Sequence, residues 1–315
     1  MKRPCEIETV EELYINGYHL EQYKQHNYKP EAYYLEGLRR DPGDIRCNTS
    51  MARLAMKNGV YADVLSYTEK AIARLTSRNQ HPTDTEAFYL RGLALVALGR
   101  DKEAYDVLYR AAWNYTHRSA AMFELACLDA KMGEYEAALE KLDESIGLNY
   151  GHTKAQNLKT AILRRLEPAL AEKAALIGLT DDKMDLFAKV EASHFMDLSD
   201  EIAQYAKKAE NLLDVVCDYM RAGLVEDALY TLELYDGDYP LIEYYKAYLT
   251  GDSLALRRAE AMESGICFPS RLEDVPVLRF AIDTLPEASN ACYYLGSLYY
   301  DRFLIVMRQK SGRRA

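Results

Sequence analysis

The chain has 315 residues, 49% of them hydrophobic, and its formal net charge at pH 7 is −10. This composition allows two ordinary domains or one extended array with a continuous core. The acidic balance argues against binding nucleic acid or an anionic membrane, since both need clustered positive charge. The chain lacks a run of 18 apolar residues, an apolar leader after its first residues and any C-x-x-C among its six cysteines. We therefore expect a soluble cytoplasmic protein.

The first two expected helices lie within residues 1–42. Thr9 and Glu12 have the spacing of a capping box, so a helix should begin there and run to about Gln25. A second helix should begin near Pro30, because proline is tolerated in a first turn, and should end before the D-P-G run at residues 41–43. We expect this pair to cap an array that follows it.

One pattern occurs twice between residues 85 and 150, as F-Y-L-R-G-L-A-L-V-A-L-G-R-D-K-E-A and M-F-E-L-A-C-L-D-A-K-M-G-E-Y-E-A-A. Gly99 aligns with Gly133 and Ala104 with Ala138, and both spacings are 34 residues. A repeat of this length, with small residues at helix contacts and a glycine between two helices, resembles the tetratricopeptide repeat (TPR). The resemblance implies an all-α fold, a right-handed superhelical solenoid of antiparallel helix pairs.

Further units flank these two. An earlier unit begins at Ile45 with Gly59 at its turn, and Thr83 with Glu86 should form a capping box before the next unit. A later unit begins near Thr153, where Glu167-Pro168 replaces the turn glycine, and its second helix is expected to span only residues 169–177.

The pattern weakens between residues 180 and 209, where we expect short helices around 185–187 and 201–208. It returns near Leu212 with Gly223 at a turn, and again over residues 240–263 with Gly251 at a turn. A helix ending at residue 284 and an incomplete last unit from residue 291 follow. The chain is accordingly divided into a capping pair at 1–42, regular units at 43–180 and irregular TPR-like units at 181–315.

The sequence contains no recognisable catalytic, cofactor or metal motif. H-E-x-x-H, G-x-S-x-G and G-x-x-x-x-G-K-[ST] are all absent, and the six histidines are not paired with cysteines at metal-ligand spacing. We therefore expect a protein that is not an enzyme and has no cofactor or metal.

A groove offers the main candidate site. In TPR arrays the first helix of each pair lines an inner groove, so residues at helical spacing on these helices should face it. The predicted groove residues are Arg46, Arg53, Lys57, Tyr89, Phe123, Lys131, Lys154, Asn157 and Arg221. Basic and aromatic side chains gathered on one wall of an acidic protein would suit an acidic or extended peptide. The alternative is that they are ordinary surface charges of helices, which specify little.

Two aperiodic stretches give a second candidate, a surface that docks another domain. One is the corner A-W-N-Y-T-H-R at residues 112–118, and the other is C-F-P-S-R-L-E-D at residues 267–274. The docking residues would be Trp113, Arg118, Phe268, Pro269 and Arg271. The simpler interpretation of the second stretch is a helix start, with Pro269 and Ser270 in the first turn and Phe268 as the hydrophobic staple.

Several runs, among them L-R-R-D-P-G-D-I-R-C-N, A-A-W-N-Y, C-F-P-S-R-L-E and A-C-Y-Y-L-G-S-L-Y-Y-D, are similar to the C-terminal helical part of a bacterial protein family. In that family a galactose-mutarotase-like β-sandwich domain of unknown function precedes a TPR region. The resemblance implies that this chain is part of a larger carbohydrate-related protein, although residues 300–308 depart from the family pattern.

The leading functional hypothesis is a non-catalytic scaffold for protein–protein or domain–domain interaction, with the β-sandwich domain as its partner. One alternative is a stand-alone adaptor that binds an acidic or extended peptide in the groove. A second is an accessory part of an enzyme whose active site the sandwich domain completes.

Overall fold

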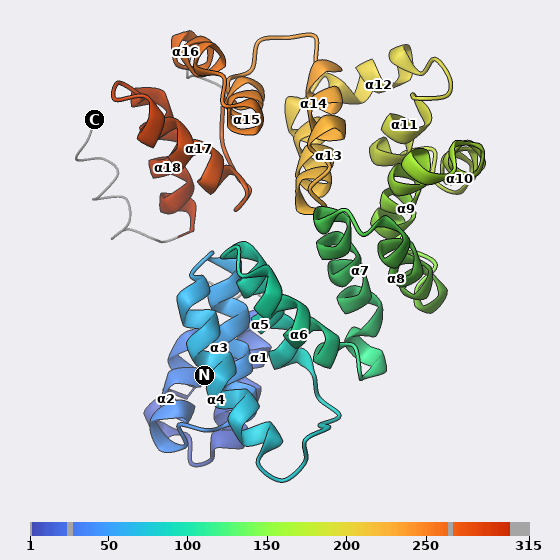
Figure 1. Ribbon diagram of the computed structural model, residues 1–315. Helices are drawn as coiled ribbons and strands as arrows, with labels where there is room; N and C mark the ends of the chain where they lie inside the picture. The colour runs from blue at the N-terminus through green and yellow to red at the C-terminus, as the bar shows by residue number, and fades with distance from the viewer. Residues whose placement is uncertain (1, 24–27, 264–266, 303–315) are drawn as a thin grey trace. The chain divides into compact units, whose positions relative to one another are not determined.

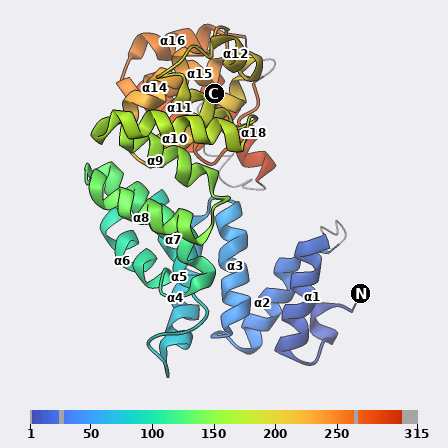
Figure 2. The same cartoon turned by 90° about the vertical axis from the view of Figure 1, so that its right-hand side faces the viewer.

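The computed structural model describes residues 2–23, 28–263 and 267–302, and every regular element in these ranges is a helix (Figure 1 and Figure 2). The expected all-α fold of paired helices is confirmed. The helices form two compact units, and we call residues 1–125 with 147–149 the first unit and residues 126–146 with 150–315 the second. The boundaries predicted at residues 42 and 180 follow repeat regularity rather than contacts, and they stay a prediction.

The first unit is built from consecutive helix pairs, α1 with α2, α3 with α4 and α5 with α6, and Figure 2 shows α1, α2 and α3 side by side. Its elements are η1 (Pro4–Glu6), α1 (Val10–Tyr23), α2 (Pro30–Arg40), α3 (Ile45–Lys57), α4 (Tyr61–Thr76), α5 (Glu86–Ala97), α6 (Asp101–Ala111) and the first part of α7 (Tyr115–Met132). Each pair buries an apolar face of both helices, which is what makes the short helices stable.

The second unit continues the same arrangement, with α9 against α10, α13 against α14, α15 against α16 and α17 against α18. Its helices are the rest of α7, α8 (Tyr135–Leu148), α9 (Thr153–Leu166), α10 (Pro168–Asp181), α11 (Leu186–Ala192), α12 (Ser199–Ala206), α13 (Ala209–Arg221), α14 (Val225–Glu233), α15 (Pro240–Thr250), α16 (Ser253–Ala261), α17 (Asp274–Thr284) and α18 (Ser289–Asp301). None of the described helices is both long and apolar enough to cross a membrane.

The predicted turn glycines are confirmed. All five turn glycines have positive φ, between 70° and 83°, a conformation that costs glycine little: Gly59, Gly99, Gly133, Gly223 and Gly251. The Glu12 amide donates to Thr9 Oγ1 at 3.1 Å, which is one of the two hydrogen bonds of the predicted capping box.

Small residues bring the helix axes together as expected. Ala104 and Ala138 are fully buried, and Gly92 on α5 lies directly against Leu108 on α6. A Cβ at position 92 would lie 2.5 Å from a methyl carbon of Leu108, so only glycine allows this approach.

Three local predictions were wrong. The helix after the loop at 76–82 begins at Glu86, whose amide donates to Asp84 Oδ1 at 3.0 Å, so Thr83 forms no capping box with it. The helix after Glu167 is not short: α10 begins with Pro168 at its first position and runs to Asp181, because alanine and leucine sustain it. The helix after Cys267 begins at Asp274, so Pro269 and Ser270 precede it and lie outside any helix.

Tyrosine supplies much of the buried core in the second unit. Tyr219, Tyr244 and Tyr245 are fully buried. Each phenol donates to a carboxylate, Tyr219 to Glu191, Tyr244 to Glu260 at 2.6 Å and Tyr245 to Asp274 at 2.7 Å. A buried hydroxyl needs such a partner, so the aromatic core brings buried acids with it.

The prediction of an incomplete last unit is only partly tested. Its first helix is present as α18, whereas the expected irregular end falls on residues 303–315, outside the described residues.

Candidate functional site

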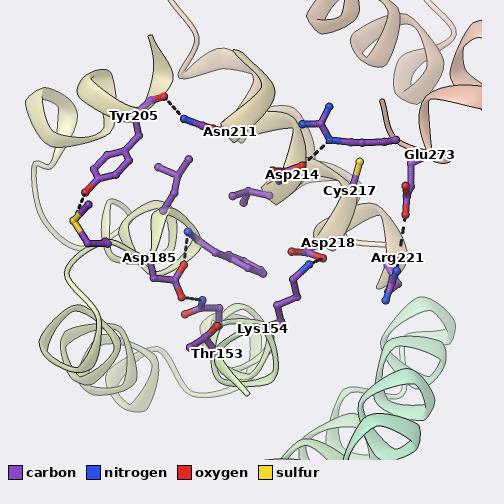
Figure 3. A pocket seen from close by; sticks show the side chains of 16 residues that line it. Thr153, Lys154, Asp185, Tyr205, Asn211, Asp214, Cys217, Asp218, Arg221 and Glu273 are labelled. Carbon is purple, nitrogen blue, oxygen red and sulfur yellow. Dashed lines mark hydrogen bonds and ion pairs between the residues drawn. The ribbon is translucent and has the colours of Figure 1, made fainter. Parts of the chain in front are cut away.

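A pocket of about 500 Å³ lies in the second unit, where α9, α11, α12, α13 and the segment 267–273 meet (Figure 3). The lining side chains are Thr153, Lys154 and Asn157 of α9, Met184, Asp185, Leu186 and Phe187 at the start of α11, Tyr205 of α12, Asn211, Asp214, Val215, Cys217, Asp218 and Arg221 of α13, and Arg271 and Glu273 of the segment. Lys154, Asn157 and Arg221, three of the residues predicted for the groove wall, are among those that line this pocket.

The start of α11 is anchored to α9 at the floor of the pocket. Asp185 caps α11, its Oδ1 accepting from the amides of Phe187 at 2.8 Å and Ala188 at 3.2 Å. Its other oxygen accepts from Asn157 Nδ2 at 2.7 Å. Asn157, a predicted groove residue, is only 4% exposed and therefore holds the floor in place rather than projecting into the groove.

Three carboxylates follow one face of α13 at four-residue spacing, Glu210, Asp214 and Asp218, and we call them the α13 stripe. Arg271 from the segment 267–273 donates through Nε to Asp214 at 2.6 Å and also pairs with Glu210. Its remaining terminal nitrogen donates to the backbone oxygen of Glu210 at 2.5 Å. Lys154 pairs with Asp218 at 2.8 Å. Figure 3 shows Asp214 and Asp218 of the stripe, with Lys154 beside Asp218, around one opening.

The charges of the pocket are unevenly compensated. Four carboxylates line it, Asp185, Asp214, Asp218 and Glu273, against the three cations Lys154, Arg221 and Arg271. Burial raises the pKa of Asp218, although the charge of Lys154 acts in the opposite direction. The pair between Arg221 and Glu273 is long, at 3.9 Å, and both side chains are partly exposed.

Apolar and aromatic groups also line the pocket. Phe187 and Val215 are buried among its lining residues, and Tyr205 donates to the sulfur of Met184 at 3.2 Å. Burial raises the pKa of the Cys217 thiol to about 12, so this thiol stays protonated and is a poor nucleophile at neutral pH. In the described part of the chain, no group of three or more His, Cys, Asp and Glu side chains could hold a metal ion.

The predicted groove cations of the first unit are paired with carboxylates of neighbouring first helices. Arg46 of α3 pairs with Glu11 of α1, and Lys57 of α3 pairs with Glu21 of α1 at 3.1 Å. Arg53 lies 3.2 Å from Glu86 of α5. These pairs run along the wall between adjacent helices, so a ligand would meet ion pairs there rather than isolated positive charges.

The other predicted groove residues differ in exposure. The Tyr89 ring stacks on His117, with 5.6 Å between ring centroids, whereas Phe123 is only 5% exposed and belongs to the core. Lys131 is exposed at the end of α7, where its Cα would lie 3.0 Å from a Cβ at Gly223.

The predicted docking residues also differ in exposure. Trp113 is 52% exposed in the corner between α6 and α7, with the ring of His81 4.7 Å away, and Arg118 lies in the first turns of α7. Phe268 is 66% exposed, whereas Pro269 is buried and Arg271 is held by the α13 stripe. Of the segment 267–273, Phe268 is therefore the large apolar group that faces outward.

The sequence identified four pocket residues, Lys154, Asn157, Arg221 and Arg271, under two separate hypotheses, and the structure brings all four together. It missed the carboxylates. The α13 stripe has a signal, acidic residues four apart, but its partners come from far along the chain, and nothing local identifies them.

No family model matches the chain. A tetratricopeptide repeat protein from Parabacteroides merdae ATCC 43184 is similar in structure over 92% of this chain and 98% of its own, with 13% identity and a TM-score of 0.52. MamA aligns over 60% of this chain and 97% of its own, with 20% identity and a TM-score of 0.46. YrrB, described as a TPR protein with an unusual peptide-binding site, aligns over 73% and 98%, with 16% identity and a TM-score of 0.42. The first of these likenesses shows a TPR-like fold.

Proposed function

We propose that this chain is a non-catalytic helical-repeat scaffold that binds a protein partner or a neighbouring domain, with the pocket on α9, α11 and α13 as its contact site. One observation carries this proposal: side chains of α9, α11, α12 and α13 and of the segment 267–273 together form a pocket of about 500 Å³ with polar, partly paired walls. Ion pairs beside apolar side chains such as Phe187 and Val215 suit a protein–protein contact.

The polar groups of the pocket serve binding better than chemistry. Asp218 is paired with Lys154, Asp214 with Arg271 and Asp185 with Asn157. A general acid or base needs a group poised to exchange a proton with a substrate, whereas these groups hold one another in place. A partner can exchange its own charged side chains for those of Arg221 and Glu273 at small cost, since these two are partly exposed and exposed pairs contribute little on their own.

The identity of the partner is a finer proposal. The similarity of the runs around residues 38–48, 111–115 and 267–273 to a family with a galactose-mutarotase-like β-sandwich domain supports such a domain as the partner, and with it a role in a larger carbohydrate-related protein. The adaptor alternative, in which a separate protein supplies an extended peptide, is favoured by the pocket itself, because non-helical chain already places the Arg271 side chain on its α13 wall.

Site-specific photo-cross-linking tests the contact site. A benzoylphenylalanine replaces Tyr205, which lines the pocket, or Tyr293, a tyrosine of α18 that is 57% exposed and outside it. We expect the probe at position 205 to cross-link a defined segment of a partner in the native cells and the probe at 293 not to do so. Cross-links only at 293, or partners captured equally by both probes, would place the contact elsewhere.

A binding measurement tests the finer proposal. A galactose-mutarotase-like β-sandwich domain from the family that the sequence resembles is purified and titrated into this chain in a calorimeter. Saturable binding that Phe268→Ser weakens supports domain docking, because Phe268 is the exposed apolar side chain of the segment. Heat of dilution alone would favour the adaptor.

A further inference from the structure

We infer that the pocket accepts a lysine or arginine side chain from an extended segment of a protein partner, with the cationic head between Asp214, Asp218 and Glu273 and the aliphatic stem against Phe187 and Val215. This inference rests on the proposed function and specifies its ligand. The inferred ligand is basic, whereas the lysines and arginines predicted for the groove had indicated an acidic ligand.

The balance of charge favours a cation. The three cations of the lining are set against four carboxylates. Arg271 already donates to Asp214, to Glu210 and to the Glu210 backbone oxygen, so little of its guanidinium remains for a ligand. The net charge of −10 on the whole chain adds a long-range field that attracts cationic segments and repels acidic ones.

The chain itself shows how this wall holds an arginine. Arg271 lies outside any helix, and its side chain is only 12% exposed where it lies on the α13 stripe. The stripe thus binds a guanidinium presented by non-helical chain, through two carboxylates and one carbonyl. Asp218 is the next carboxylate of the same stripe, one helical turn further on.

Asp218 differs from its neighbours in the kind of partner it has. Its side chain is 11% exposed, while that of Lys154, the cation paired with it, is 55% exposed. The carboxylate accepts a hydrogen bond from a solvated lysine, and the charge of Arg221 also acts on it, yet burial outweighs both and raises the pKa of Asp218, so its charge is incompletely compensated. A second cation placed beside it would gain more than at an exposed carboxylate, because the surroundings screen less.

The floor fits the stem of such a side chain. Phe187, Val215 and Leu186 line the pocket beside the carboxylates. Lysine and arginine characteristically lay their methylene groups along apolar surface while the charged head reaches polar partners. An acidic side chain in the same place would have a short stem and would bring a fifth carboxylate next to four others, which complementarity disfavours.

Fluorescence anisotropy with defined peptides tests the inference. The probes are three labelled nine-residue peptides, Gly-Ser-Ala-Leu-Xaa-Leu-Ala-Ser-Gly, with arginine, glutamine or glutamate as Xaa, titrated with the full chain at low salt. We expect the arginine peptide to bind at least about 10-fold more tightly than the glutamine peptide, and the glutamate peptide to bind most weakly. Raising the salt concentration should reduce this difference.

Two variants locate the binding. Glu273→Gln alters a side chain that is 45% exposed, so the fold should tolerate it, and Asp218→Asn removes the buried charge. Each should weaken the arginine peptide about 3- to 10-fold and leave the glutamine peptide unchanged. Asp283→Asn, at an exposed position of α17 outside the pocket, is the matched control and should change neither.

Three results would overturn the inference. The first is equal binding of the arginine and glutamine peptides, or no binding of any peptide at millimolar concentration. The second is preference for the glutamate peptide, and the third is displacement of the arginine peptide by equimolar spermidine, which would make the ligand a free polyamine. The cross-linking at Tyr205 decides the proposed function separately, since it does not depend on the charge of the partner.

Discussion

Glu191 of α11 is fully buried, and its carboxylate is held by Arg164 of α9, whose Nε lies 2.8 Å from Oε2. The same guanidinium reaches Asp227 of α14 at 2.6 Å, and Arg165 pairs with the other oxygen of Asp227 at 2.5 Å. Burial alone would lower the pKa of Arg164, but the hydrogen bonds and charges of Glu191 and Asp227 raise it. We call these four residues the buried ion cluster.

Replacing Arg164 by methionine should destabilise the second unit strongly. The change keeps most of the side-chain volume but leaves Glu191 buried without its cation, which typically costs about 3–5 kcal/mol. Urea unfolding followed by circular dichroism measures the loss. Arg100→Met is the control, because Arg100 pairs with Glu103 on the surface and should contribute less than about 1 kcal/mol. Equal midpoints for the two variants would contradict the prediction.

Two glycine-to-alanine changes should alter the free energy of unfolding in opposite directions. Gly92→Ala puts a Cβ 2.5 Å from a Leu108 methyl carbon, and we expect overpacking of α5 against α6 to cost about 1–3 kcal/mol. Gly147→Ala, in helix α8, meets nothing within 4 Å, so the better helix propensity of alanine should stabilise by about 0.5–1 kcal/mol. Free energies of unfolding from urea titrations compare the two, and adding Leu108→Ala should restore part of the loss in the first variant.

Asp274→Ala should release the segment 267–273. Asp274 is fully buried, and one of its oxygens accepts from the amides of Ser270 and Arg271, both at 3.0 Å. Removing the acceptor leaves the two amides without this partner and the Tyr245 hydroxyl with the Cys217 sulfur alone, at a cost of about 1–3 kcal/mol. Brief trypsin digestion should then cut after Arg271 in the variant first. Asp283→Ala, exposed on the same helix, should leave the digestion pattern unchanged. If Arg271 were protected from trypsin in both variants, the prediction that Asp274 holds the segment in place would be contradicted.

Acidification should destabilise the protein partly through His194. Burial, followed by the charge of Arg164, lowers the pKa of His194 to about 4. Between the unfolded pKa of about 6.5 and about pH 4, the unfolded chain binds a proton that the folded chain does not, so stability falls as pH falls through this range. Although the ring is partly desolvated beside Tyr230, His194 as a residue remains open to solvent. Solvent screening should therefore limit the effect to about 1 kcal/mol. The difference in thermal midpoint between His194→Gln and wild type should therefore grow from pH 7 to pH 4.5, and a constant difference would contradict this.

Regular local signals were predictable from the sequence, and their failures have physical reasons. The turn glycines were identified because positive φ between two helices needs glycine. This requirement recurs in five helix pairs, from α3 with α4 to α15 with α16. The length of α10 was missed because Glu167-Pro168 was taken as a sign of weakness, whereas proline at a first helical position is compatible with a full helix. The start of α17 was misplaced because Pro269 and Ser270 suit a cap, while a distant tertiary partner, Tyr245, fixes Asp274 instead.

Only part of the candidate site could be predicted from the sequence. Helical spacing placed Lys154, Asn157 and Arg221 on the groove wall, but spacing within one helix carries no information about what pairs across helices. Asp218 lies 64 residues from Lys154 and Arg271 57 residues from Asp214. Positive charge in the sequence therefore predicted an acidic ligand, whereas the folded chain compensates these cations with its own carboxylates.

The buried ion cluster also bears on how helix pairs find their correct neighbours. Repeated pairs present similar apolar faces, so a folding chain could stack them in a wrong order with little loss of hydrophobic contact. Arg164, Glu191 and Asp227 come from three different helices, α9, α11 and α14, and they satisfy one another only when these helices meet in the native order. A stack that skipped α11 would bury a charge alone. The cluster thus acts as a check on assembly order, at the point where the repeat sequence is least regular.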